Sequence, residues 1–163
     1  MPFTPFHLGP GLLVGLLLLR FLDFPTFLLA SVVVDLEPFL VMLLGLDYPL
    51  HGFFHSFLGG SIAAFALALA MLKLRPSISG VVSLLRLKQS VSSRGIWAAS
   101  LLGVYLHVLL DSPLYPEMKP FYPLAANPLL SSSMFIGFQV YALCTICLVI
   151  GVFLYAYRVL RAR

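Results

Sequence analysis

The chain has 163 residues, of which 61% are hydrophobic and 10% are charged, against about 45–50% and about 25% in an ordinary soluble domain. A mean hydropathy of +1.03 leaves too few polar side chains to cover a globule of this size, so lipid must solvate much of its surface. We therefore exclude a soluble globular protein and expect a multi-pass protein of the cell membrane, in which the net charge of +4 indicates topology rather than a nucleic-acid partner.

Apolar windows predict an all-α membrane bundle of about five transmembrane helices, forming one domain over 1–163. The windows lie at 8–22, 25–45, 53–73, 96–112 and 134–157. We interpret the first as a mature helix rather than a signal peptide, because no basic residue precedes it. Pro38 should kink or end the second helix. Gly11 and Gly15 in the first window, with Gly59 and Gly60 in the third, predict close helix packing and would also allow a homo-oligomer.

Two segments are basic and contain no acid. They are the loop at 74–95, with Arg75, Arg86, Lys88 and Arg94, and the end of the chain, with Arg158, Arg161 and Arg163. The positive-inside rule places both in the cytoplasm, so with five spans the amino terminus lies outside. The connection at 113–133 then lies outside too. Its five prolines predict an extended cap rather than a helix.

The remaining ionisable residues are unevenly distributed. All four histidines, and every acid except Asp23, lie toward the side predicted to be outside. Placing an ionisable side chain within a membrane span is unfavourable by at least a few kcal/mol, unless the group pairs, binds an ion or lines a water-filled cavity. Their convergence at one end of the bundle therefore predicts a functional site.

The spacing of these residues favours a metal site. His51 and His55 in HGFFH are four residues apart, as are His107 and Asp111 in HVLLD, so on helices each pair presents two ligands to one side. Zinc and related transition metals bind imidazole nitrogen and carboxylate oxygen. Asp35, in VVVDLEPF, would add a carboxylate from the second span. We expect a divalent metal, with zinc as the first choice and manganese or iron as alternatives.

Other candidate residues have simpler interpretations beside the functional one. His7 would complete the ligand set, but an interfacial histidine also bonds headgroups or backbone. Glu37 points away from Asp35 on a regular helix, so it joins the metal only if Pro38 distorts the backbone, or else it transfers the proton. Asp47 suits a turn, and Glu117 suits a solvated pair with the nearby lysine of the 113–133 loop. Ser56 and Ser112 each follow a site residue, but no GxSxG elbow surrounds either.

Four motifs together resemble a known family. TPFHLGPG, DLEP, HGFFHSFLGG and HVLLDSPLY, within residues 3–128, are similar to the small membrane proteins known as membrane-bound metal-dependent hydrolases, the LexA-regulated group. The resemblance implies metal-site roles for matching positions of this chain, with the number of metal ions left open. These positions are His7, Asp35, His51, His55, His107 and Asp111.

We therefore expect a membrane-embedded metal-dependent hydrolase whose substrate is a lipid-like ester or phosphoester near the outer interface. The metal would activate a water, and Asp35 or Glu37 would accept its proton. Two other functions compete with this one. A metal carrier would need a polar path to the cytoplasm, which the inner halves of the spans hardly offer. A non-catalytic structural or accessory subunit of a membrane complex would use the same His/Asp cluster as a buried network.

Overall fold

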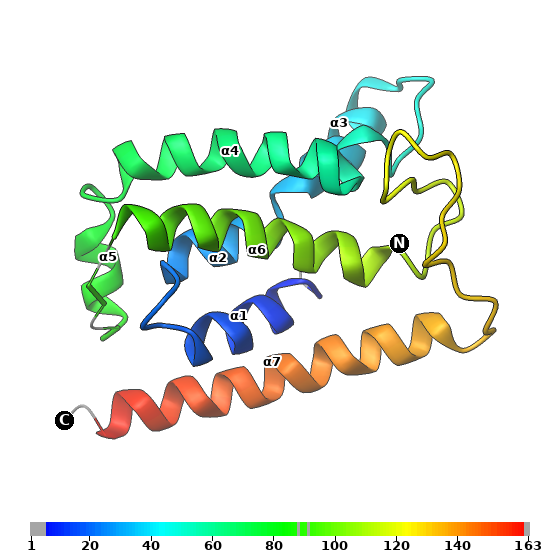
Figure 1. The fold of residues 1–163 in the computed structure, drawn as a ribbon. Coiled ribbons are helices and arrows are strands. Elements are labelled where there is room, and N and C mark those ends of the chain that lie inside the picture. The colour runs from blue at the N-terminus through cyan, green and yellow to red at the C-terminus, as the bar shows by residue number, and fades with distance from the viewer. Residues whose placement is uncertain (1–5, 88, 91, 162–163) are drawn as a thin grey trace.

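The computed structural model describes residues 6–87, 89–90 and 92–161, and within them the regular structure is entirely helical (Figure 1). The predicted all-α fold is confirmed for this part of the chain. Thr4 and Pro5 of the first motif, and the basic residues Lys88 and Arg163, lie outside the described residues. The elements are α1 Leu8–Leu17, α2 Phe24–Ala30, the 3-10 turn η1 Val33–Asp35, α3 Leu36–Leu44, the 3-10 turn η2 Phe53–His55, α4 Phe57–Leu74, α5 Ser79–Leu84, α6 Ser93–Asp111 and α7 Ile136–Arg161.

Among the described residues, four helical segments are long and apolar enough to cross a membrane. They are Phe24–Leu44, Phe57–Leu74, Ser93–Asp111 and Ile136–Arg161. The first predicted span, at 8–22, is shorter than expected: α1 has 10 residues, and the chain continues in turns from Leu18. At 1.5 Å per residue α1 is about 15 Å long, half the ~30 Å hydrocarbon layer. The bundle thus has four helical segments of spanning length and one half-length helix, which packs along α7 (Figure 1).

The second predicted span is interrupted, but the break lies at residues 31–35, before Pro38, where the kink or end was expected. Helix α2 ends at Ala30, and α3 begins at Leu36 after the η1 turn. Pro38 is the third residue of α3, within the first turn, where a backbone N–H would have no partner in the helix. The helix can therefore restart just before Pro38. This break places Asp35 at the junction rather than on the side of a continuous helix.

Small residues allow the helices to pack closely. A Cβ atom on Gly103 of α6 would lie 2.5 Å from the Ala30 Cβ, and one on Gly60 of α4 would lie 2.7 Å from a Val104 methyl. A Cβ atom on Gly11, a glycine of the first apolar window, would likewise lie 2.6 Å from the Ser31 Oγ. Helix α6 therefore lies directly against both α2 and α4, as the glycines predicted.

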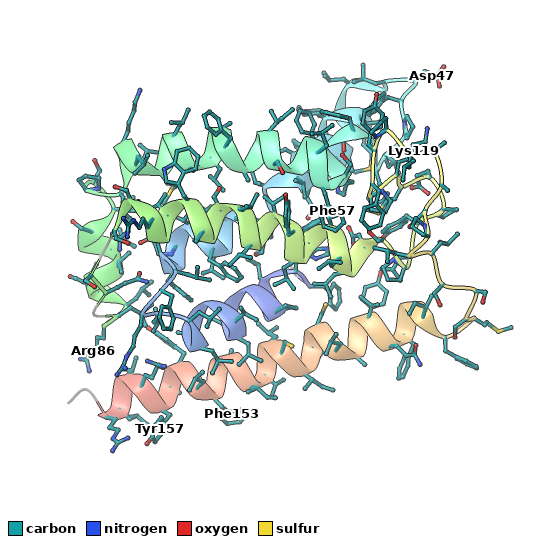
Figure 2. All side chains as sticks on the ribbon, in the orientation of Figure 1. Asp47, Phe57, Arg86, Lys119, Phe153 and Tyr157 are labelled. Atoms are coloured by element: carbon teal, nitrogen blue, oxygen red, sulfur yellow. The ribbon has the colours of Figure 1, made fainter. Side chains whose placement is uncertain are left out.

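The two ends of the bundle differ in charge. Figure 2 shows Arg86 at the end where α4 finishes and α6 begins, and Asp47 and Lys119 at the opposite end. The basic end contains one buried ion pair, in which Arg75 Nε donates to Asp23 Oδ1 at 2.7 Å. Apart from Asp23 and Lys119, the basic residues and the His/acid residues thus lie at opposite ends. Which end faces the cytoplasm stays a prediction.

The connection at 113–133 folds over the acidic end without forming a helix. Pro120 accepts a hydrogen bond through its carbonyl from the Phe57 N–H at 2.8 Å, and Met118 is fully buried. Asn127 donates to the carbonyls of Ser112 and Tyr115, at 2.8 and 3.1 Å. These contacts tie the loop to the ends of α4 and α6.

Candidate metal centre

Four predicted site residues meet near the covered end of the bundle. Asp35, His55, His107 and Asp111 each offer one ligand atom, and these atoms all lie within 4.8 Å of one another. Asp35 ends η1, His55 ends η2, and the other two residues lie one turn apart on α6. Residues far apart in the sequence are therefore brought together by the break in the second span and by the turn before α4.

The distances within this group are suitable for enclosing a cation. His107 Nε2 lies 3.4 Å from Asp35 Oδ1 and 3.2 Å from Asp111 Oδ2. His55 Nε2 lies 3.9 Å from Asp35 Oδ1. The His55 and His107 side chains are completely buried, whereas the Asp35 side chain is 13% exposed. Asp35 is therefore the one partly exposed member of the group.

Several inward-facing atoms of the group have no hydrogen-bond partner among the described residues. They are Nε2 of His55, Nε2 of His107 and Oδ1 of Asp111. A buried polar atom without a hydrogen-bond partner lowers the stability of the folded protein by about 1–3 kcal/mol. A divalent metal would use the lone pairs of such atoms, and two imidazoles with two carboxylates form a donor set suited to zinc. The donor set therefore fits the expected divalent metal.

The opposite nitrogen of each imidazole is held by an acceptor. His107 Nδ1 donates to the Ser31 carbonyl at 2.8 Å, and His55 Nδ1 donates to Glu37 Oε2 at 2.7 Å. A carbonyl can only accept, so the Nδ1 of His107 carries a proton, and its Nε2 faces the group. Glu37 fixes His55 in the same way. This is the arrangement by which metal-ligating histidines are oriented in proteins.

Glu37 lies behind His55 and not beside Asp35. Its carboxylate also accepts from the backbone N–H groups of Gly52 and Phe54, both at 3.1 Å. These two bonds hold the turn that carries His55. Although burial opposes the charged form of His55, the neighbouring carboxylates of Asp35 and Glu37 raise the pKa of this imidazole to about 9. A metal at this site must therefore displace a proton from His55.

His7 joins the group from the start of α1. Its ring stacks on His107 with centroids 3.8 Å apart, and its Nε2 lies 3.2 Å from Asp111 Oδ1. His7 is 2% exposed, and neither ring nitrogen has a hydrogen-bond partner among the described residues. The structure thus places His7 next to the four residues, on the Asp111 side.

His51 lies beside the four-residue group but is not part of it. Its Nδ1 pairs with Glu117 Oε1 at 2.9 Å, and its ring stacks on Tyr115 with centroids 3.7 Å apart. The expected helical pair with His55 does not form, because HGFFH is a turn and α4 begins only at Phe57. Burial lowers the pKa of His51. The expectation that Glu117 pairs with a lysine in its own loop is not met, since Glu117 bonds His51.

The other residues considered in the sequence have structural roles. Ser56 caps α4 by accepting from the Gly59 N–H, and Ser112 donates to the Val108 carbonyl within its own helix. Asp47 is exposed in the turn after α3. One partner, the Ser31 carbonyl, escaped the sequence reasoning, because a backbone carbonyl carries no side-chain signal. Glu37 was a candidate from the sequence, but its contact with His55 was not predicted.

Comparisons with protein-family models, with curated protein sequences and with solved structures give no match to this chain. The resemblance to membrane-bound metal-dependent hydrolases therefore stays a prediction that rests on the four motifs.

Proposed function

We propose that this chain is a membrane-embedded, metal-dependent hydrolase of the cell membrane that cleaves an ester or phosphoester of an amphiphilic, lipid-like substrate. One observation carries the proposal. Two buried imidazoles and two carboxylates converge, and each imidazole is held through Nδ1 so that its Nε2 is directed into the group. An incidental cluster of histidines would not require this matched orientation.

The side chains divide into ligands and orienting groups. In the proposal His55, His107, Asp111 and Asp35 hold a divalent metal, with zinc as the first choice. When bound, such a metal polarises the scissile group and supplies a nucleophilic water at neutral pH. Asp35, the one partly exposed member, is the residue placed to exchange a proton with an entering substrate. Glu37 is a positioning residue for His55 rather than the proton acceptor.

The location of the site supports an amphiphilic substrate. His107 lies one turn before the end of α6, a helix long and apolar enough to cross the membrane. The 113–133 connection covers this end of the bundle. A head group entering beside that loop could reach the site while its hydrocarbon tail stays in lipid.

The test is turnover by purified protein on a panel of lipid esters and phosphoesters, with zinc added or removed by chelation. We expect hydrolysis that is lost on chelation and restored by zinc, and that falls by at least about 100-fold in Asp35→Asn. Asp47→Asn is the control, because Asp47 is exposed outside the cluster. Hydrolysis that persists after the metal is removed, or that is unaffected in Asp35→Asn, would refute the proposal.

One observation favours a second candidate, a non-catalytic subunit. His55, His107 and Asp111 are at most 1% exposed, so the group could stabilise the bundle without admitting a substrate. In that case chelation would lower the unfolding midpoint of the protein, and no member of the substrate panel would be cleaved.

A further inference from the structure

An apolar groove lies between α3 and α4, with a volume of about 640 Å³. Leu36 and Leu40 of α3 line one side of it, and Ala63, Ala66 and Ala70 of α4 line the other. Both helices belong to segments long and apolar enough to cross a membrane. The groove therefore lies at the level of the hydrocarbon layer, where only an apolar occupant is stable.

The break in the second span and the alanines of α4 explain this groove. Because α3 restarts after η1, it does not continue along the line of α2 (Figure 1). On α4 the alanines recur at intervals of three and four residues, so they share one side of the helix. Larger side chains there would fill the space. Ala66 and Ala70 are instead exposed.

One end of the groove reaches Glu37, the residue that holds the candidate ligand His55. Among the described residues, Glu37 is the only acid that lines it, and the same carboxylate holds His55 at 2.7 Å. From Ala63 to Ala70 the groove follows α4 for about 10 Å, away from the site and toward the basic end. It thus has the direction that the tail of a substrate would take when its head is at the site.

A smaller polar cavity adjoins the groove. Its volume is about 160 Å³, and its lining includes His51, Glu117 and Lys119. Tyr48 lines both cavities. An elongated molecule could therefore place a polar head among these polar side chains and an apolar tail in the groove, with its middle next to Tyr48 and Glu37.

We propose that the α3–α4 groove binds a fatty acyl chain of a membrane lipid and sets the chain length of the lipid on which the site acts. The binding of the acyl chain is argued from the groove alone. The selection of substrates by acyl-chain length rests on the proposed hydrolase function. Annular lipid would cover the whole surface of the bundle without preference, whereas a chain in the groove is retained at one place.

Retention of lipid can be measured without any turnover. The detergent-purified protein, incubated with long-chain phosphatidylglycerol, is examined by native mass spectrometry under conditions that strip annular lipid. We expect one retained lipid in the wild type and at least about tenfold less in Ala66→Phe, because the phenyl ring fills the groove. Ala156→Phe, the same change at an exposed position of α7, should retain lipid as the wild type does.

Equal retention by all three proteins, or no retention in the wild type, would overturn the proposal even if hydrolysis is observed. Conversely, loss of retention in Ala66→Phe alone supports the acyl site even if no substrate is cleaved. With an active enzyme, Ala70→Phe should shift the preference toward shorter acyl chains, since Ala70 lies farthest along the groove from the site. If Ala70→Phe leaves the preference of the enzyme for acyl-chain length unchanged, the groove does not select the chain length of the substrate.

Discussion

Replacing Glu37 with glutamine tests whether the residue behind His55 decides metal affinity. The carboxylate accepts three hydrogen bonds, from His55 Nδ1 at 2.7 Å and from the Gly52 and Phe54 N–H groups at 3.1 Å each. Glutamine offers one acceptor oxygen and one donor NH₂, so it cannot satisfy all three donors. His55 then loses the charged partner that directs its Nε2 into the group.

Loss of such a partner typically weakens metal binding by about 10- to 100-fold, or about 1.4–2.7 kcal/mol. The assay is zinc titration against a competing chelator, repeated from about pH 7 to about pH 9. The pH series separates two effects of the substitution: a changed His55 pKa, which alters how strongly protons compete with zinc, and a less well oriented His55 ring. The matched control is Glu117→Gln, which removes the partner of His51 at 2.9 Å. We expect its zinc affinity to stay within about twofold of the wild type. Equal affinities in Glu37→Gln and the wild type, or a larger loss in Glu117→Gln, would refute the assigned roles.

Three further predictions concern charge and topology. Asp23→Asn should lower the free energy of unfolding by about 3–5 kcal/mol in a denaturant titration, because Arg75 stays buried without its counter-ion; an unchanged midpoint would contradict this. Zinc affinity should rise about tenfold per pH unit up to the His55 pKa of about 9, since below that pH the metal displaces one proton, and a flat profile in the titration would contradict this. A cysteine at Lys119 should label from outside intact cells and one at Ser83 should not, and the reverse pattern would invert the predicted orientation.

The sequence predicted where the helices lie better than where they break. Apolar windows locate segments that need lipid, and α4, α6 and α7 fall within or close to three of them. The window at 8–22 overestimated α1, because hydropathy does not register the turn that begins at Leu18. Pro38 correctly indicated an interruption in the second span, although the break lies before it, at residues 31–35. The consequence of the break, a groove beside α4, depends on the path of α3 and has no local signal.

The candidate site was predictable where a regular helix carries it. His107 and Asp111 face one way because α6 is continuous through both. The same spacing in His51 and His55 was misleading, because the Gly52 backbone is not helical, at φ −89° and ψ −135°, and only His55 turns into the group. The buried pair at the opposite end joins residues 52 positions apart and could not be found from local pattern.

The most direct test of the account is the metal content of purified protein, measured by mass spectrometry without added nickel, for the wild type beside His55→Ala/His107→Ala. The account predicts stoichiometric zinc, manganese or iron in the wild type and its loss in the double variant, since both imidazoles direct Nε2 into the group. A folded wild type that contains no metal and takes up none on addition would contradict the metal centre and leave the cluster as a structural network.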